Sequence, residues 1–200
     1  MTTPDLEHLS KADPVMARLI AKVGVCAMKP RRLPPFQSLV HSIIYQQLSG
    51  KAAAAILGRF EALFSRFPTP EEVLAISAER LRSAGLSRPK ASYLLGLAEH
   101  AVAGRIPSLK MCQDLADSEI IERLTEVKGV GRWTAEMFLM FNLGRPDVLP
   151  VYDLGVRKGF QIAFRKRALP EPEYLERFGR KWSPYRTTAA RYLWRAVDSE

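Results

Sequence analysis

Cysteine is scarce in this 200-residue chain, which contains only Cys26 and Cys112, far apart in the sequence. Two distant cysteines form neither a disulfide framework nor a zinc-ligand pattern, so reduced core thiols are expected. The three histidines, His8, His41 and His100, also lack a second ligand at metal spacing. No apolar run is long enough to span a bilayer and no secretory leader is recognisable. An intracellular, soluble protein without a membrane partner is therefore expected.

Patterns typical of β-structure are missing as well. No stretch alternates polar and apolar residues over the length of a strand, and there is no internal repeat or long low-complexity segment. Helical spacing is common instead, as in Gln37–Leu48, where the apolar residues share one face. A hydrophobic content of 47% can bury the core of one compact unit or of two lobes. The sequence therefore predicts an all-α fold.

Local signals predict several helix starts. Asp13-Pro14 combines a capping residue with proline at the first helical position, and Ser49 is placed to cap the next helix. Thr69–Glu72 has the sequence of a capping box. Met1–Ser10 shows no clear pattern, so no element is predicted there. The basic, proline-stiffened segment Lys29–Pro35 marks a boundary between two lobes.

Acidic residues are outnumbered. The chain has 30 Lys and Arg against 21 Asp and Glu, which gives a net charge of +9. The excess is largest between Arg157 and Arg195, where eleven basic residues accompany three acids. A basic cluster is often only a solvated face, but this balance favours a polyanionic partner, and its place after Asp153 favours DNA.

The segment Leu124–Gly159 carries the strongest local pattern, because one amphipathic helix ends at Gly129 and another follows Gly131. Glycines on both sides of Val130 allow a tight hairpin with positive φ and an uncovered backbone. The free N–H groups and the positive dipole end of the second helix then form an anion site. On a basic protein the expected anion is a nucleic-acid phosphate.

A single carboxylate, Asp153, stands between the apolar stretch Val148–Val151 and a basic segment that begins at Arg157. Aspartate is a favoured N-cap, so Asp153 could cap a helix that starts near Leu154. A carboxylate in this setting also suits catalysis, and one residue can serve both purposes. The residue pattern leaves both interpretations open.

Together these motifs resemble a known family. KGVGRWTAE (128–136) and LGRPDVLPVYDLGVRKG (143–159) are similar to the helix-hairpin-helix DNA glycosylases, specifically the 3-methyladenine DNA glycosylase II branch. The similarity extends to IIYQQLSGKAAAAI (43–56), LRSAGLSRPKASYL (81–94) and WSPYRTTAARYLWR (182–195), in the family's order. It covers nearly the whole chain from about Pro14 onward, whereas a lone GVG hairpin would be weak evidence.

The resemblance implies two helical lobes with a helix-hairpin-helix motif and the active site in the cleft between them. Residues 29–145 would form one lobe, which ends in the helix-hairpin-helix. Residues 1–28 and 146–200 would form the second lobe, which carries the catalytic aspartate and the base pocket.

The resemblance also implies roles for individual residues. Asp153 matches the catalytic acid, and the residues matching the base pocket are Trp133, Trp194, Met137 and Tyr152. The predicted DNA-binding residues are Gln46, Gln47, Leu48, Lys128, Gly129, Val130, Gly131, Arg132 and Arg157. In the family the junction at 46–48 plugs the gap left by an extruded nucleotide. Gln47 stands where the best-known bacterial relatives carry an apolar wedge, and Leu48 is the alternative. From spacing alone, the tryptophans would be interpreted as core residues and the glutamines as solvated.

The implied activity is that of a monofunctional DNA glycosylase in base excision repair. Such an enzyme flips alkylated purines, including 3-methyladenine and 7-methylguanine, out of double-stranded DNA and excises them. Relatives that also cleave the backbone carry a lysine nucleophile at the position of Trp133. The cysteine-rich tail that holds an iron–sulfur cluster in the endonuclease III branch is absent from this sequence. No cofactor is expected to be required, although the backbone carbonyls of Thr125, Val127 and Val130 match a monovalent cation site for Na⁺ or K⁺.

Two other functions stay open on this evidence. A non-catalytic helix-hairpin-helix DNA-binding protein would leave Asp153 and the tryptophans without a role, and a bifunctional glycosylase-lyase would need an amine nucleophile. We expect a monomer that acts on damaged double-stranded DNA, in the cytoplasm at the nucleoid of a bacterium or in the nucleus of a eukaryote.

Overall fold

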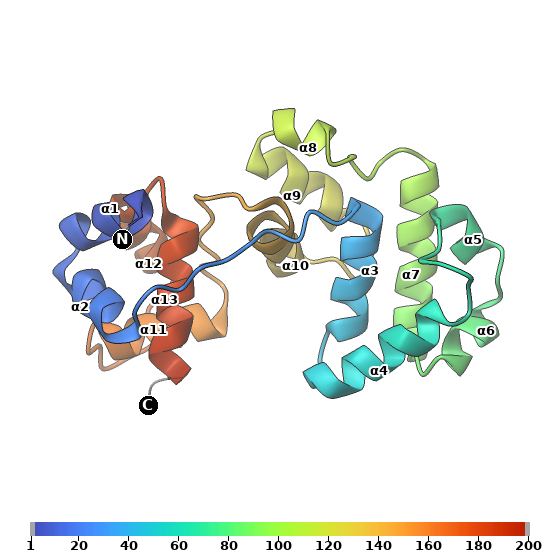
Figure 1. Cartoon of the computed structure of the whole chain (residues 1–200), viewed down its shortest axis with the longest axis horizontal. Coiled ribbons are helices and arrows are strands. Elements are labelled where there is room, and N and C mark those ends of the chain that lie inside the picture. The colour runs from blue at the N-terminus through green and yellow to red at the C-terminus, as the bar shows by residue number, and fades with distance from the viewer. Residues whose placement is uncertain (1–2, 199–200) are drawn as a thin grey trace. The chain divides into compact units, whose positions relative to one another are not determined.

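The computed structural model of the chain describes residues 3–198. Within this range the chain is helical and has no strand, which confirms the predicted all-α class (Figure 1). It divides into two compact units, one from the described parts of Met1–Pro30 and Leu139–Glu200, the other from Arg31–Phe138. The sequence placed the changes between lobes after residues 28 and 145, whereas the compact units change after Pro30 and Phe138.

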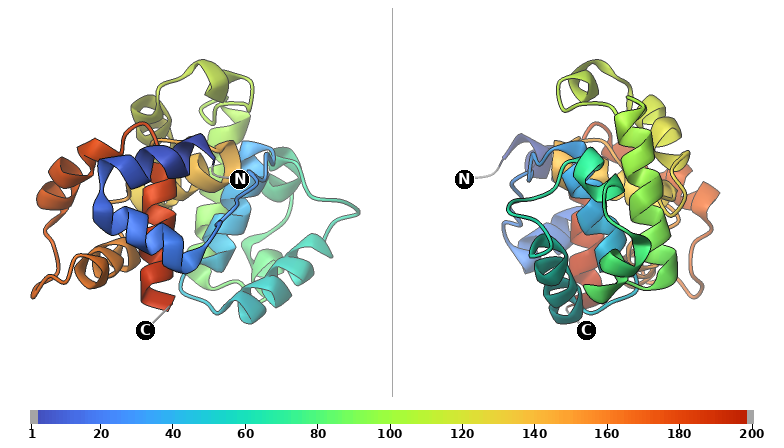
Figure 2. Two further views of the ribbon diagram at one scale, coloured as in Figure 1. Left: turned by 60° about the vertical axis from the view of Figure 1, so that its left-hand side comes forward. Right: turned by 90° about the vertical axis from the view of Figure 1, so that its right-hand side faces the viewer.

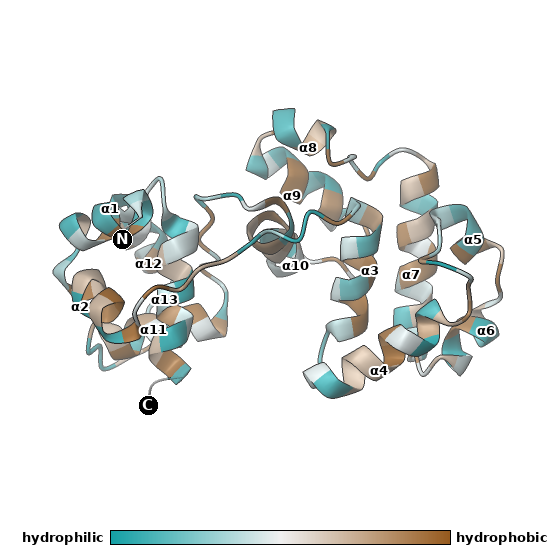
Figure 3. Cartoon of the chain, viewed as in Figure 1, coloured by the Kyte–Doolittle hydropathy of each residue, from teal (hydrophilic) through white to brown (hydrophobic). Residues whose placement is uncertain are grey.

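The unit Arg31–Phe138 is built around one long helix, α7. Its helices are α3 (Pro35–Tyr45), α4 (Gly50–Glu61), α5 (Pro70–Leu74), α6 (Ala78–Ser83), α7 (Arg88–Val102), α8 (Met111–Asp114), α9 (Asp117–Thr125) and α10 (Arg132–Met137). Helix α7 packs against α3, α5 and α6, as the views in Figure 2 show. Brown and teal residues alternate around α4 and α7 in Figure 3, as expected of helices with one buried face. The α9–α10 pair is the predicted helix-hairpin-helix.

The predicted caps in this unit are present. The Ser49 side chain accepts a hydrogen bond from the Ala52 N–H at 3.3 Å and caps α4. At α5 the Thr69 hydroxyl accepts from the Glu72 N–H at 3.3 Å, while the Glu72 carboxylate accepts from the Thr69 N–H at 2.7 Å. These reciprocal bonds satisfy two backbone donors that the helix itself leaves unpaired.

The second unit combines the two ends of the chain. It contains α1 (Pro4–Ala12), α2 (Pro14–Val23), the π-helix η1 (Phe138–Leu143, whose first residue belongs to the other unit), α11 (Leu154–Ala163), α12 (Pro172–Gly179), the short 3₁₀-helix η2 (Arg180–Trp182) and α13 (Arg186–Asp198). Helix α13 packs against α11, α2 and α1 (Figures 1 and 2). The buried side chains of Phe160 and Trp182, together with Phe164 and Phe178, form an aromatic cluster in its core.

Helix α1 corrects the prediction that Met1–Ser10 has no element; residues 1 and 2 of that segment lie outside the described range. Leu6 and Leu9 of α1 are buried, and Thr188 of α13 donates a hydrogen bond to Asp5 at 2.8 Å. A two-leucine pattern is too short to indicate a helix by periodicity. The partner that stabilises it lies at the other end of the sequence.

The predicted cap at Asp13 is present and has additional partners. One carboxylate oxygen accepts from the Val15 N–H at 2.9 Å and caps α2. The other accepts from the Trp182 indole N–H at 3.3 Å and lies 2.8 Å from the Lys181 ammonium. Asp13 is 1% exposed, so this buried charge is stabilised by hydrogen bonds and an ion pair from the far end of the chain.

Helices α11 and α13 approach closely because Gly159 has no side chain. A β-carbon at this position would lie 1.9 Å from the backbone oxygen of Leu193. The close approach brings the first turn of α11, which follows Asp153, next to the turn of α13 that carries Trp194.

Candidate functional site

Asp153 is the N-cap of α11, so the capping interpretation is correct. Its Oδ1 accepts a hydrogen bond from the Val156 N–H at 2.7 Å. The same oxygen accepts a second hydrogen bond, also 2.7 Å long, from the indole Nε1–H of Trp194. Two donors on rigid helices therefore orient the carboxylate at the positive end of the α11 dipole.

Gly155 makes room for this arrangement. A β-carbon there would lie 2.8 Å from Cδ1 of Trp194 and 3.1 Å from Oδ1 of Asp153. Any larger residue would push the indole away from the carboxylate. Packing therefore explains why residue 155 is a glycine, although it lies within a helix, where glycine is normally unfavourable.

Trp194 is half-buried, and its ring stacks on that of Phe141. The two rings stack with centroids 5.9 Å apart and an interplanar angle of 26°. At α-helical spacing Phe141 would share a helix face with Trp133 and Met137. In the structure the α-helix ends at Met137, and Phe141 lies in the π-helix η1, where the wider turn changes the register. Sequence reasoning missed this contact because a π-helix has no clear signature.

The residues beside Asp153 differ in exposure. Tyr152, predicted to border the base pocket, is 60% exposed, and Leu154 is 55% exposed. Arg157, predicted to bind DNA, donates from Nε to the Pro170 carbonyl at 2.8 Å and lies 3.9 Å from Glu171. These contacts attach the segment before α12 to α11, and the DNA-binding role of Arg157 stays a prediction.

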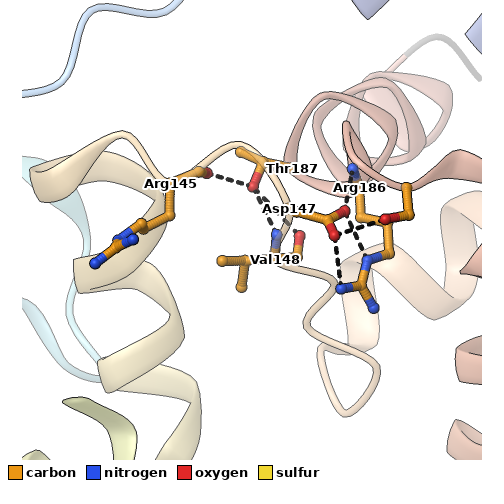
Figure 4. Close-up of polar contacts among 6 residues, drawn as sticks. Arg145, Asp147, Val148, Arg186 and Thr187 are labelled. Atoms are coloured by element: carbon orange, nitrogen blue, oxygen red, sulfur yellow. Dashed lines mark hydrogen bonds and ion pairs between the residues drawn. The ribbon is translucent and has the colours of Figure 1, made fainter. Parts of the chain in front are cut away.

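An ionic clamp fixes the segment that leads to Asp153 (Figure 4). The Asp147 carboxylate accepts from Nε and Nη2 of Arg186 at 2.7 and 2.9 Å, and from the Ser183 hydroxyl at 2.8 Å. It also accepts the Arg186 backbone N–H at 3.2 Å. A bidentate arginine–carboxylate pair with additional donors defines both position and orientation.

Thr187 completes this clamp one residue further along α13. Its hydroxyl donates to the Arg145 carbonyl at 2.7 Å and accepts from the Val148 N–H at 3.0 Å (Figure 4). Its backbone N–H donates to the Pro146 carbonyl at 3.0 Å. Residues 145–148 are thereby attached to the start of the helix that carries Trp194.

The clamp also lowers the pKa of Asp147. Burial alone would raise the pKa of this carboxyl, but hydrogen bonds from Arg186 and Ser183 and the arginine charge outweigh it. The side chains of Asp147 and Arg186 are 26% and 28% exposed, so the pair is partly withdrawn from solvent screening.

The hairpin in the other unit differs from the prediction in one detail. Gly129 has a φ of +92°, and a β-carbon there would lie 2.4 Å from the ring of Tyr93 on α7. Gly131, by contrast, has a φ of −88° and nothing within 4 Å of a β-carbon position. Only Gly129 is required by backbone conformation. Gly131 is the N-cap of α10 and leaves the helix start uncovered.

The α3–α4 junction separates the roles of the adjacent glutamines. The Gln46 side chain points to the hairpin, where Nε2 donates to the Gly129 carbonyl at 2.9 Å and lies 3.5 Å from the Thr134 hydroxyl. Gln47 is exposed and has a φ of +57°, and Leu48 is 39% exposed. Gln47 and Leu48 are thus exposed, whereas the Gln46 side chain holds the hairpin backbone, and insertion of the junction into DNA stays a prediction.

The junction, the hairpin and α7 border one cavity of about 570 Å³. Its lining residues are Gln46, Gln47, Ser87, Pro89, Lys90, Tyr93, Thr125, Val127, Lys128, Gly129, Val130 and Gly131. Six of the nine predicted DNA-binding residues line this cavity.

Helix α10 carries the remaining predicted residues of this unit. Arg132 donates from Nε to the buried carboxylate of Glu136 at 2.9 Å, while its own side chain stays 59% exposed. Trp133 is 48% exposed, which is unusual for a tryptophan of a core, and Met137 is half-buried. This exposure excludes the core interpretation of Trp133, and the pocket roles of Trp133 and Met137 stay predictions.

Residues 3–198 contain no cluster of three or more His, Cys, Asp or Glu side chains arranged for a metal ion. No helix within them combines the length and apolar character needed to cross a membrane.

Comparison with known proteins gives a family match. The model of the HhH-GPD superfamily base excision DNA repair protein matches residues 40–184, which include the junction, the hairpin, Asp153 and the Asp147 side of the clamp. DNA-3-methyladenine glycosylase 1 of Schizosaccharomyces pombe is 39% identical over 194 residues, which cover 94% of this chain and 84% of the relative.

Solved structures show the same similarity. The S. pombe 3-methyladenine DNA glycosylase Mag1 in complex with abasic DNA superposes with a TM-score of 0.84 at 39% identity, covering 96% of each chain. The DNA-3-methyladenine glycosidase of Bacillus halodurans gives a TM-score of 0.88 at 39% identity, covering 98% of this chain and 89% of that one.

Proposed function

The chain belongs to the HhH-GPD superfamily of base excision DNA repair proteins, and on this premise we propose that it is a monofunctional DNA glycosylase. It excises alkylated purines, among them 3-methyladenine and 7-methylguanine, from double-stranded DNA. The observation that carries the proposal is the Asp153 carboxylate, oriented by the Trp194 indole and the start of α11.

The chemistry requires a positioned anion. Hydrolysis of an N-glycosidic bond develops positive charge on the sugar, and a nearby carboxylate stabilises that charge or accepts a proton from the attacking water. Asp153 is the residue proposed for this role. Because its orientation is set by two short hydrogen bonds, little reorganisation is needed when the charge develops.

One carboxylate is enough when the base is alkylated. Such a base is cationic, and it leaves without first being protonated by a general acid. Trp194, whose ring is supported by Phe141, supplies an aromatic face with an affinity for cations. The same side chain would then position the acid through its N–H and attract the damaged base through its ring.

The absence of an amine at position 133 supports hydrolysis without strand cleavage. Trp133 cannot form a Schiff base, whereas bifunctional relatives use a lysine at this position. Lys128 is exposed in the hairpin, where its charge suits a phosphate better than a sugar carbon.

The residues that line the 570 Å³ cavity are suited to binding the DNA backbone and the minor groove. The uncovered N-terminus of α10 and the lysine of the hairpin would bind a phosphate, while Gln47 or Leu48 fills the gap left by the flipped nucleotide. A monovalent cation on the carbonyls of Thr125, Val127 and Val130 would add to the phosphate site, and Na⁺/K⁺ titration of DNA affinity tests this. The protein is proposed to act as a monomer. Its proposed location is that of the cellular DNA, which is the nucleoid in a bacterium or the nucleus in a eukaryote.

The deciding experiment compares the wild type with Asp153→Asn on duplexes that carry single lesions. Wild type should release 3-methyladenine, whereas Asp153→Asn should bind the same DNA and lose most excision. Asp198→Asn, which neutralises an exposed carboxylate on α13, is the matched control and should keep full activity. Excision by Asp153→Asn near the wild-type rate would reject this role.

The same duplexes test the two alternatives. A non-catalytic DNA-binding protein would bind but release no base from any lesion in the panel. A glycosylase-lyase would be trapped covalently on damaged DNA by borohydride, and the proposal predicts that no such adduct forms.

A further inference from the structure

The last carbonyl groups of α3, at the junction, cannot accept hydrogen bonds from within the helix. Helix α3 ends at Tyr45, and the chain then turns through Gln47 in the left-handed region, with a φ of +57°. A non-glycine residue in this conformation is uncommon and needs support from its surroundings. The last carbonyls of α3 also form the negative end of its dipole.

Lys90, on the first turn of α7, provides this support. Its ammonium donates to the Ile44 carbonyl and to the Gln46 carbonyl, each at 2.7 Å. The two carbonyls flank Tyr45, the last residue of α3, so one positive charge caps α3 and fixes the backbone just before Gln47. Burial lowers the pKa of Lys90, because the ammonium gives up part of its hydration at this site.

The same face of α7 also supports the hairpin. One turn after Lys90, the ring of Tyr93 packs directly on Gly129, where no β-carbon would fit. Gln46, whose carbonyl Lys90 binds, donates its side-chain amide to the Gly129 carbonyl at 2.9 Å. Junction, hairpin and α7 are thus joined in a closed circuit of contacts around the 570 Å³ cavity.

We propose that Lys90 is a positioning residue that holds the insertion junction (Gln46–Leu48) and the phosphate-binding hairpin (Lys128–Gly131) in one fixed geometry. The inference rests on the proposed function, because it assigns insertion to the junction. Lys90 itself does not need to contact the damaged base. Its effect passes through the Gln46 backbone to Gln47 and, through the Gln46 side chain, to Gly129.

The test uses Lys90→Met, which keeps the length of the side chain and removes its donors. DNA duplexes carry either no lesion or an abasic-site analogue next to 2-aminopurine, whose fluorescence reports insertion into the stack. Lys90→Met should bind the intact duplex nearly as wild type does, since the hairpin remains. It should lose about tenfold or more of the preference for abasic DNA, together with the 2-aminopurine signal. A loss of about tenfold is expected for one hydrogen bond from a charged donor, and Lys90→Met removes two.

Two further variants separate positioning from charge. Arg88→Met removes the same charge two residues away from an exposed side chain, and it should keep the fluorescence signal. Lys90→Arg retains donors for both carbonyls and should recover much of the preference for abasic DNA. Loss of the signal in Arg88→Met equal to that in Lys90→Met would overturn the proposal in favour of simple electrostatics.

A double-mutant cycle with Gln46→Ala tests the route. If Lys90 acts through the junction, the losses in Lys90→Met and Gln46→Ala should not add, because both break the same circuit. Strictly additive losses would overturn the positioning role of Lys90. A Lys90→Met protein with a lower melting temperature but the wild-type 2-aminopurine signal would overturn it as well. If Lys90→Met does not fold, Lys90→Gln, with a shorter side chain and a neutral donor, takes its place with the same criteria.

The measurements of DNA binding and of 2-aminopurine fluorescence do not depend on catalysis. A wild-type protein that excises no base would contradict the proposed function, while the fluorescence and the cycle would still decide the role of Lys90.

Discussion

The indole N–H of Trp194 donates a 2.7 Å hydrogen bond to the carboxylate of Asp153. If Trp194 also lines the base pocket and Asp153 is the catalytic acid, as proposed, Trp194 has two separable effects on the reaction. One effect acts on every substrate and the other only on a cationic base.

Trp194→Phe should separate these effects. Loss of the indole donor should slow single-turnover excision of neutral and cationic bases alike by about tenfold, as expected for one hydrogen bond to a charged group. Weaker cation binding should slow 7-methylguanine further, relative to neutral hypoxanthine if that base is a substrate. An equal loss on both bases would leave orientation of Asp153 as the whole effect, and unchanged rates on both would contradict both roles.

Trp182→Phe is the matched control for Trp194→Phe. It also removes an indole bond to a carboxylate, that of Asp13, in the same unit. We expect a lower melting temperature, because the residue is fully buried, with an unchanged excision rate for the folded protein.

The Asp147–Arg186 clamp should make stability depend on pH at the acid end. The pKa of Asp147 is lowered on folding, so its ionised form stabilises the protein above the ordinary value of 3.8, and this contribution is lost as the pH falls through the lowered value. Asp147→Asn should therefore cost about 1–3 kcal/mol at neutral pH. The difference from wild type in urea midpoints should shrink below the ordinary pKa, and a constant difference across that range would contradict the ionic account.

The two hairpin glycines should respond differently to substitution. Gly129→Ala should destabilise the protein, since a left-handed φ alone costs roughly 1–2 kcal/mol and the ring of Tyr93 occupies the β-carbon position. Gly131→Asp should melt like wild type but bind abasic DNA more weakly, because its carboxylate would face the phosphate site. Normal DNA affinity of Gly131→Asp would show that the hairpin does not bind phosphate.

Gly159→Ala should be among the most damaging single-methyl changes in the chain. The added carbon would overlap a backbone carbonyl of α13 at 1.9 Å, so α11 and α13 must separate, at a cost of about 3 kcal/mol or more. Gly96→Ala on α7 is the control, because nothing lies within 4 Å of its β-carbon position. That change should raise stability by up to about 1 kcal/mol through helix propensity. Thermal melts that rank the two variants in the opposite order would reject this packing argument.

The sequence predicted best what depends on neighbouring residues. Asp13, Ser49 and Thr69 are the caps that their local patterns indicate, because capping needs only a side chain and the next turn of backbone. The hairpin between α9 and α10 was found for the same reason, since glycine spacing marks a turn. The family match confirms the class of protein that the motifs indicated.

Features that depend on distant residues could not be predicted from local patterns. The inward direction of Gln46 follows from Gly129, 83 positions later, and helix α1 depends on α13. The contact of Phe141 with Trp194 depends on a π-helix, which differs from an α-helix by one residue per turn and has no composition of its own. The cap at Asp153 could be inferred from its neighbours, but its hydrogen bond from Trp194 could not, because the donor lies 41 positions later in the sequence.

The discontinuous unit has a consequence for synthesis on the ribosome. The segment 31–138 can fold as soon as it emerges, because its helices pack on one another. Leu6, Leu9, Met16 and Leu19 of the first two helices instead pack in a unit completed by α11 and α13. At ordinary elongation rates these leucines and the methionine wait on the order of ten seconds before their partners are made. During that interval the apolar faces of α1 and α2 lack these partners, so chaperones can bind them.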